Sequence, residues 1–298
     1  MQHEDTEVVV VGLSTGAAIV PELARRGVKV TGLDRADGLA STLNNQRWKH
    51  GGLLYPRREL AQKLWDAYAH MHPLERRHLR NIGGHFLVRT QEDLDAYEAL
   101  WRDWGIPFGR LAPNVLRPHR TVGNPVYAGG FLTFDSVIDF PALLPALHAH
   151  AMRLGARLLT GATVTRLVRN GETVTGVVYA KDGHEMLLHC KHCIVAMGGW
   201  APEMLRAIGV QLPVQRWKSN ILTVDTEIVP RITVWLDAAG VTLVPYAGRT
   251  LIADKRCYPA TDGNDRTLVP EAVEGLIADL ADCFPRLRQR RLAVRPHT

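Results

Sequence analysis

The beginning of the chain alternates apolar runs with one amphipathic stretch. Residues 7–12 are almost wholly apolar, as in a buried strand, and residues 15–26 place their apolar side chains on one helical face. Gly27 ends this helix, and residues 28–33 form a second apolar run. The pattern predicts a β-α-β unit whose two parallel strands are joined by a right-handed crossover.

The next part of the chain reads mainly as helices. Helical periodicity marks residues 56–82, 91–105 and 139–154, whereas the short run at 85–88 is strand-like. These segments predict three helical regions with one strand between the first two.

Strand-like sequence dominates after the third helix. Residues 156–180 contain strands that turn at Asn170-Gly171, a dipeptide typical of β-hairpins, and a further strand is expected at 193–197. Four more apolar runs between 211 and 256 predict an antiparallel sheet. No Pro-, Gly- or Ser-rich linker separates these segments, so we expect an α/β chain whose domains are interleaved.

Composition and charge limit the class of protein. With 46% hydrophobic and 22% charged residues over 298 positions, the chain has the composition of a globular protein. The apolar run at 8–13 is far shorter than the roughly 20 residues of a transmembrane helix, so we expect no transmembrane segment. The net charge of +6 suits a small anionic partner, but the basic residues are spread along the chain, and nucleic acid is not an expected partner.

The cysteines indicate the compartment and argue against a metal site. Four cysteines in 298 residues are too few and too scattered for a disulfide framework, which favours a reducing, cytoplasmic location. Cys190 and Cys193 form one C-x-x-C pair, but Cys257 and Cys283 lack the spacing of a second zinc-binding pair. We therefore expect no bound metal.

The loop that follows the first strand allows two interpretations. Residues 12–16, GLSTG, match the G-x-S-x-G pattern of a nucleophile elbow and lie between a strand and a helix. An α/β-hydrolase places this elbow in the middle of its sheet and takes an oxyanion donor from an earlier loop, but only seven residues precede Val8. The hydrolase interpretation is therefore the weaker one.

The second interpretation is a dinucleotide-binding loop. That motif needs glycines where the backbone approaches a pyrophosphate, and an acid about 20 residues later that binds a ribose hydroxyl. Asp34 ends the second strand and Gly16 has the position of the third glycine. If Gly12 is the first glycine, the loop is one residue short and Ser14 takes the second position. Ser14 and Thr15 still allow an anion to approach the helix N-terminus.

Four segments carry a resemblance to a known family. They are residues 8–35, the loop ASTLNNQRWKHGGLLYP at 40–56, the strands at 161–178 and CIVAMGGWAPEML at 193–205. Together they resemble the FAD-dependent oxidoreductases of the D-amino acid oxidase superfamily, in the same order and at similar spacing. The resemblance implies a Rossmann-type FAD-binding domain interleaved with an antiparallel α+β substrate domain.

The resemblance also implies domain limits and cofactor contacts. We expect the FAD-binding domain at 1–85 and 139–210, and the substrate domain at 86–138 and 211–285. The residues expected to bind FAD come from the glycine loop, the loop toward the flavin, the adenine-side strand and the turn after the last strand: Gly12, Ser14, Thr15, Gly16, Asp34, Arg35, Ser41, Thr42, Asn45, Val164, Gly198 and Gly199.

The implied reaction is hydride transfer from a CH–NH or CH–OH group of a small amino acid or hydroxy acid to the flavin. An arginine commonly clamps the anionic end of such a substrate, and Arg249 and Arg256 are the candidates. His50 is expected to accept the substrate proton, and Tyr246 to donate a hydrogen bond. Each has a purely structural alternative: a solvated arginine, a histidine bonded to backbone, or a packed tyrosine.

The last residues add a further expectation. AVRPHT at 293–298 resembles the point where the family continues into a glycine-rich strand and helix, so we expect a chain cut short relative to the family, with an open sheet edge. The sequence thus predicts an FAD-dependent oxidoreductase, with a non-catalytic nucleotide-binding remnant of such an enzyme as the alternative.

Overall fold

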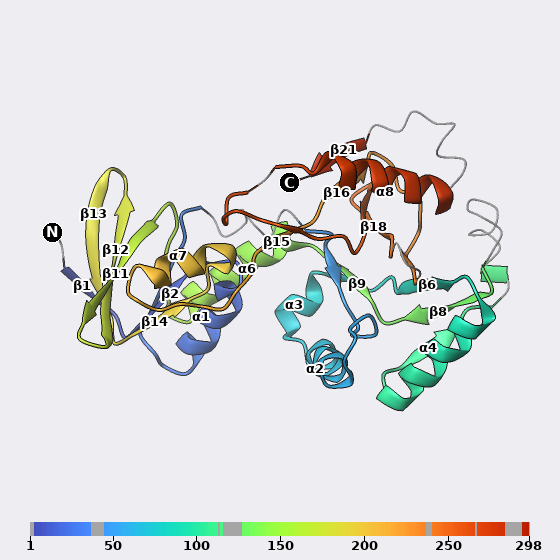
Figure 1. Ribbon diagram of the computed structural model, residues 1–298. Helices are drawn as coiled ribbons and strands as arrows, with labels where there is room; N and C mark the ends of the chain where they lie inside the picture. The colour runs from blue at the N-terminus through green and yellow to red at the C-terminus, as the bar shows by residue number, and fades with distance from the viewer. Residues whose placement is uncertain are drawn as a thin grey trace. The chain divides into compact units, whose positions relative to one another are not determined.

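The computed structural model describes residues 3–36, 45–112, 114–115, 127–236, 240–265, 267–283 and 294–297 (Figure 1). Contacts divide the chain into two discontinuous units. Unit 1 comprises residues 1–44, 140–217 and 259–265, and unit 2 comprises residues 45–139, 218–258 and 266–298. Residues 45–85, which we expected in the FAD-binding domain, belong to unit 2 by their contacts.

The core of unit 1 is a parallel sheet of four strands in the order β10-β3-β2-β14. The strands β2 (Val8–Val11) and β3 (Val30–Leu33) flank helix α1 (Gly16–Arg25) in sequence, which confirms the predicted β-α-β unit. The outer strands are β10 (Arg157–Leu159) and β14 (His192–Val195), and helix α6 (Phe140–Arg153) packs beside α1.

Strand β2 is buried on both faces, which explains its unbroken apolar sequence. Val8 and Val10 point into a cluster with residues of α1 and α6, while Val9 and Val11 point into a cluster on the other face. Successive side chains of a strand alternate between the two faces of its sheet, so the four consecutive valines pack into the hydrophobic clusters on both faces.

A second sheet covers the other side of unit 1. Its order is β1-β13-β12-β11, formed by β1 (His3–Asp5), β13 (His184–His189), β12 (Thr173–Lys181) and β11 (Thr163–Asn170). Strands β11 and β12 pair antiparallel across the predicted Asn170-Gly171 turn, where Gly171 has φ of +57°. The unit also contains the 3-10 helix η2 (Gly198–Trp200) and helix α7 (Ala201–Arg206).

Unit 2 is built on an eight-stranded sheet in the order β21-β16-β19-β18-β17-β6-β8-β7. All neighbouring strands are antiparallel except β17 and β6, which are parallel. The strands are β6 (Gly84–Val88), β7 (Phe108–Arg110), β8 (Gly129–Thr133), β16 (Ile221–Val224), β17 (Ile232–Trp235), β18 (Thr242–Tyr246), β19 (Arg249–Ala253) and β21 (Val294–His297).

The two faces of this sheet pack against different helices. Leu94, Trp101 and Trp104 of α4 (Gln91–Trp104) join the hydrophobic cluster on one face, and Leu276 and Leu280 of α8 (Pro270–Cys283) join the cluster on the other. The antiparallel sheet predicted from the four runs is therefore confirmed, with the earlier strands β6, β7 and β8 added along one edge.

A small three-stranded sheet, β4-β9-β5, completes the regular structure of unit 2. It consists of β4 (Trp48–Lys49), β9 (Ser136–Ile138) and β5 (Leu79–Arg80), all antiparallel. Two further short strands, β15 (Trp217–Lys218) and β20 (Tyr258–Pro259), pair with each other.

The helix expected over 56–82 is interrupted. Helix α2 (Arg58–Ala69) ends before α3 (Pro73–Arg77), and the last residues of the range form β5. Pro73 lacks a backbone N–H and favours the first turn of a helix, where that N–H has no partner. His72 caps the new helix, because its side chain accepts a hydrogen bond from the backbone N–H of Leu74.

Candidate nucleotide-binding and catalytic site

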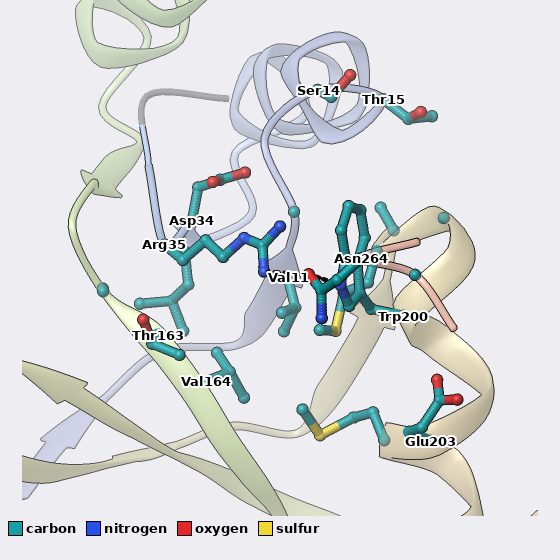
Figure 2. A pocket seen from close by; sticks show the side chains of 18 of the residues that line it. Val11, Ser14, Thr15, Asp34, Arg35, Thr163, Val164, Trp200, Glu203 and Asn264 are labelled. Carbon is teal, nitrogen blue, oxygen red and sulfur yellow. Dashed lines mark hydrogen bonds between the residues drawn. The ribbon is translucent and has the colours of Figure 1, made fainter. Parts of the chain in front are cut away.

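A cavity of about 430 Å³ lies at the carboxyl ends of β2, β3 and β14 in unit 1 (Figure 2). The loop before α1, the beginning of β11, η2, helix α7 and the segment 262–264 also contribute to its lining. Ligands of open α/β sheets bind at this edge, beyond the carboxyl ends of the strands. The position predicts a nucleotide site.

Gly12 is held in a place that only glycine fits. Its φ is +96°, and a Cβ atom there would lie 2.4 Å from the carbonyl oxygen of Ala196. Its backbone N–H donates to Leu33 O at 2.8 Å. The loop is thus pulled tightly over the ends of β3 and β14.

Leu13 explains how the short loop closes. Its side chain is fully buried and lies against Gly16 and Gly32, because a Cβ at Gly32 would come within 2.6 Å of Leu13 Cδ2. The leucine therefore packs into the core under α1 and leaves the cavity to Ser14 and Thr15. Gly16 allows close packing of helix on strand, since a Cβ there would lie 2.9 Å from Val10 Cγ1, which is the role of the third glycine in the motif.

The carboxylate of Asp34 joins the loop to the end of β3. Its Oδ2 accepts a hydrogen bond from the backbone N–H of Leu13 at 2.7 Å, and its Oδ1 accepts one from Ala36 at 2.9 Å. Each carboxylate oxygen has a second lone pair. Asp34 can therefore hold the loop and still accept a hydroxyl hydrogen bond from a ligand in the cavity.

An arginine and a tryptophan also line the cavity. The guanidinium carbon of Arg35 lies 4.3 Å from the ring centroid of Trp200, and Trp200 Nε1 donates to Asn264 Oδ1 at 2.9 Å (Figure 2). Gly263 packs directly on the indole, since a Cβ there would lie 2.8 Å from three ring atoms. Sequence reasoning missed residues 262–264, because an Asp-Gly-Asn turn does not indicate which cavity it reaches.

The structure brings most of the predicted cofactor residues together. Gly199 lies beside the cavity and its carbonyl accepts from Arg216 Nε at 2.6 Å. Asn45 belongs to unit 2 and accepts a hydrogen bond from Arg47 N at 2.7 Å, while Ser41 and Thr42 lie outside the described residues. The predicted residues that line the cavity are Gly12, Ser14, Thr15, Asp34, Arg35, Val164 and Gly198.

His50 lies in unit 2, in a segment with two aromatic neighbours. Its ring stacks on Trp48 with centroids 3.9 Å apart, and Tyr55 lies edge-on at 5.7 Å. Burial, and to a lesser extent the charge of Lys49, lower the pKa of His50 to about 4. Its Nδ1 atom is buried and has no hydrogen-bond partner among the described residues. The imidazole is therefore neutral near pH 7.

The other three predicted catalytic residues have partners within unit 2. Tyr246 donates to Asp139 Oδ1 at 3.3 Å. Arg249 Nε lies 3.2 Å from Asp225 at an exposed position. Arg256 pairs with Asp254, at 3.1 Å from its Nε, and with Asp279. Both guanidinium groups thus already contact carboxylates of the chain.

The described part of the chain offers neither a membrane span nor a metal cluster. None of the helices there has both the length and the apolar composition to span a bilayer. The same residues contain no group of three histidine, cysteine or acidic side chains placed to bind one metal ion.

Comparisons with known proteins assign the family. Residues 7–297 match the family described as "FAD dependent oxidoreductase" (DAO). A D-amino acid dehydrogenase of Xylella fastidiosa (strain M12) is 30% identical over 216 residues, which are 69% of this chain and 48% of that protein. An anaerobic glycerol-3-phosphate dehydrogenase component of Escherichia coli (strain K12) is 26% identical over 234 residues, 76% of this chain and 43% of that protein. The chain spans about half the length of these curated relatives.

Solved structures show the same fold. Glycine oxidase from Geobacillus kaustophilus superposes with a TM-score of 0.78 at 23% identity, over 98% of this chain and 83% of the oxidase. L-proline dehydrogenase from P. horikoshii gives a TM-score of 0.73 at 18% identity, over 99% and 81% of the two chains. The match over residues 7–297, together with the cavity at the end of the parallel sheet, places this chain in the DAO family of FAD-dependent oxidoreductases.

Proposed function

We propose that the protein oxidises a CH–NH or CH–OH group of a small anionic amino acid or hydroxy acid, with FAD as the hydride acceptor. The observation that carries the proposal is the cavity of unit 1, where Asp34 at the end of β3 faces the beginning of α1. Family membership supports the cofactor. The relatives named as amino acid dehydrogenases and oxidases support the substrate class.

The residues of the cavity fit the adenosine diphosphate part of FAD. Ser14 and Thr15 precede the N-terminus of α1, where the positive end of the helix dipole favours phosphate. Asp34 has lone pairs for ribose hydroxyl groups, and the apolar Val164 offers a surface for the adenine. When bound, FAD supplies the hydride acceptor that no amino acid side chain provides.

We propose unit 1 as the FAD-binding domain and unit 2 as the substrate domain. This assignment keeps the predicted interleaving but moves residues 45–85 to the substrate domain, and residues 211–217 and 259–265 to the FAD-binding domain. We also retain the proposed cytoplasmic location. Its support is that Cys190, Cys193 and Cys257 are free thiols.

His50 is the proposed acceptor of the substrate proton. A neutral imidazole is able to accept a proton, and the lowered pKa keeps the ring neutral before substrate binds. A substrate carboxylate placed near the ring would raise that pKa toward the working pH, where a general base is most effective. An anionic substrate would therefore make His50 a more effective base.

Arg249 is the better proposed clamp for that anion. Its guanidinium is 55% exposed and pairs with one carboxylate, Asp225. Arg256 pairs with two carboxylates, Asp254 and Asp279, and would have to release both. Tyr246 already donates its hydroxyl hydrogen to Asp139, so we propose that it stabilises unit 2 in addition to any contact with substrate.

Flavin spectroscopy tests the proposal. The purified full chain is titrated with FAD, and the complex is mixed anaerobically with D-alanine, glycine, L-proline, a 2-hydroxy acid or glycerol 3-phosphate. We expect saturable FAD binding, and loss of the oxidised flavin band with at least one substrate. No binding of FAD, or binding without bleaching by any substrate, would contradict the proposed oxidation and favour the non-catalytic nucleotide-binding alternative.

A further inference from the structure

The segment that carries His50 is tied to one short strand. We call residues 45–52 the His50 segment. Its residues Trp48 and Lys49 form β4 and pair with Val137 and Ser136 of β9. Two aspartates flank β9 in sequence, Asp135 before it and Asp139 after it. The strand thus presents a carboxyl group at each of its ends.

Asp135 binds the His50 segment on both sides of the histidine. Its Oδ1 accepts a hydrogen bond from the indole Nε1 of Trp48 at 2.8 Å and one from the backbone N–H of Gly51 at 3.0 Å. Its Oδ2 accepts a third hydrogen bond, from the hydroxyl of Thr133. Two of the three donors therefore come from residues that flank His50.

The carboxyl group of Asp135 is buried as well as hydrogen-bonded. It is 3% exposed, and burial raises its pKa against the effect of the three donors. A buried carboxylate is costly unless hydrogen bonds satisfy it. The three hydrogen bonds offset the cost of burying Asp135, and two of them join it to the His50 segment.

Close packing leaves the His50 segment little freedom. A Cβ at Gly51 would lie 2.3 Å from the carbonyl oxygen of Phe134, and one at Gly52 would lie 2.5 Å from that of Ala61. The His50 ring stacks on the same indole that Asp135 holds. The backbone and the side-chain neighbour of the imidazole are therefore both fixed relative to Asp135.

We propose that Asp135 is a positioning residue for His50: its carboxylate holds Trp48 and Gly51 and thereby sets the direction of the imidazole. The proposal rests on the proposed role of His50 as proton acceptor. Asp135 itself touches no reacting group. Its effect passes through the stacked indole and the backbone next to the histidine.

The first test measures the placement of His50 without any reaction. The imidazole Cε1–H resonance of the full chain without cofactor, assigned by its loss in His50→Gln, is titrated by NMR. In the parent we expect a pKa of about 4. In Asp135→Ala we expect the pKa of His50 to rise toward 6.5, because the imidazole becomes more solvated. We expect the same rise in Trp48→Phe, which keeps a ring for stacking but removes the indole donor.

The matched control is Thr133→Val. It removes the third donor to the same carboxyl group, but Thr133 lies outside the His50 segment. We expect a lower melting temperature and an unchanged pKa of His50. If Asp135 acted only through its charge, its removal would leave the pKa of His50 unchanged or lower it, since an anion stabilises the protonated ring. Either result would overturn the proposal.

The second test uses flavin reduction at saturating FAD. A displacement of about 1 Å can cost about 100-fold in rate, so we expect Asp135→Ala to reduce flavin about 100-fold more slowly with little change in KM. Asp135→Asn keeps an oxygen for both Trp48 and Gly51 and should restore the rate to within a few-fold of the parent. An equal loss in both variants would contradict positioning by hydrogen bonds. If the parent itself reduces no flavin, the proposed function fails, while the NMR result still decides the placement of His50.

Discussion

The backbone N–H of Leu13 donates to the carboxylate of Asp34 at 2.7 Å. This bond links the glycine loop to the acid at the end of β3, the two parts that were recognised separately in the sequence. The same carboxylate is therefore expected to serve both the loop and the ribose of the cofactor. Variants of Asp34 should change the two properties together.

Asp34→Ala should weaken FAD binding about 10- to 100-fold, since a hydrogen bond to a charged group contributes about 1.5–3 kcal/mol. It should also lower the melting temperature of the cofactor-free chain, because the Leu13 N–H loses its acceptor. Fluorescence titration with FAD and thermal melts measure the two effects. Asp34→Asn, which keeps one oxygen, should show a smaller loss of FAD affinity and of melting temperature. Unchanged FAD affinity in Asp34→Ala would rule out a ribose contact.

Leu13→Ala and Ser14→Ala should separate stability from binding. Leu13 is fully buried under α1, so its truncation should lower the free energy of unfolding by about 2–5 kcal/mol. Ser14 lines the cavity and should instead change FAD affinity with little effect on stability. Urea unfolding and FAD titration of both variants provide the comparison. A loss of stability in Ser14→Ala that equals that of Leu13→Ala would contradict this division.

Gly12→Ala should be far more harmful than Gly27→Ala. Both glycines have positive φ, +96° and +79°, which costs an L-residue about 1–2 kcal/mol. A Cβ at Gly27 meets no atom within 4 Å, whereas one at Gly12 collides with Ala196 O. We expect Gly27→Ala to lower the stability only by this cost of positive φ. Gly12→Ala should lower the stability further and should also weaken FAD binding. Similar melting temperatures for the two variants would refute the close contact.

His50 should make the protein less stable as the pH falls. Its pKa is about 4 in the folded chain against an ordinary value of 6.5. Between these values the unfolded chain binds a proton that the folded chain does not, so the free energy of unfolding decreases by at most about 1.4 kcal/mol per pH unit. This contribution is complete above pH 6.5 and is lost as the pH falls toward 4.

Urea unfolding from pH 7 to 4 measures this dependence. His50→Gln should unfold with a shallower pH dependence than the parent. The control is His184→Gln, which removes an imidazole from an exposed position of β13. Parallel curves for His50→Gln and the parent would show that the ring is not buried as a neutral group.

Arg249→Ala should affect substrate more than stability. Exposed ion pairs contribute about 0–1 kcal/mol, and the pair with Asp225 is exposed. Steady-state kinetics should show a KM at least tenfold higher, with FAD affinity unchanged. Asp225→Asn is the control: it frees the guanidinium and should leave KM equal or lower. A KM of the parent value in Arg249→Ala would transfer the proposed clamp to Arg256.

The elements that sequence predicts well are those with local signals. The β-α-β unit follows from apolar runs around an amphipathic helix, and the β11–β12 hairpin follows from Asn170-Gly171. The range 56–82 failed because its helical periodicity continues through Pro73, where α3 starts anew. The spacing of apolar residues indicates which side of a helix is buried. It does not reveal where one helix ends and another begins if the spacing continues through the break.

The candidate site shows the limit more clearly. In the sequence, Leu13 looks like a defect in the glycine loop. Its burial against Gly16 and Gly32 depends on three-dimensional packing, which the sequence pattern does not predict. Asp135 lies 84 positions from Gly51, which it binds. A contact at that separation needs the pairing of β4 with β9 to be known first.

The interleaving of the two units has a consequence for biosynthesis. Unit 1 needs residues up to 265, and unit 2 pairs β6 with β17, about 150 positions later in the chain. Neither unit can therefore complete its fold while only the first half of the chain has left the ribosome, because β2 then has its neighbour β3 but still lacks β14, and β6 lacks β17. Pairings between distant segments form slowly, and chains in that state are prone to aggregation. Expression at low temperature or with chaperones should accordingly raise the yield of folded protein.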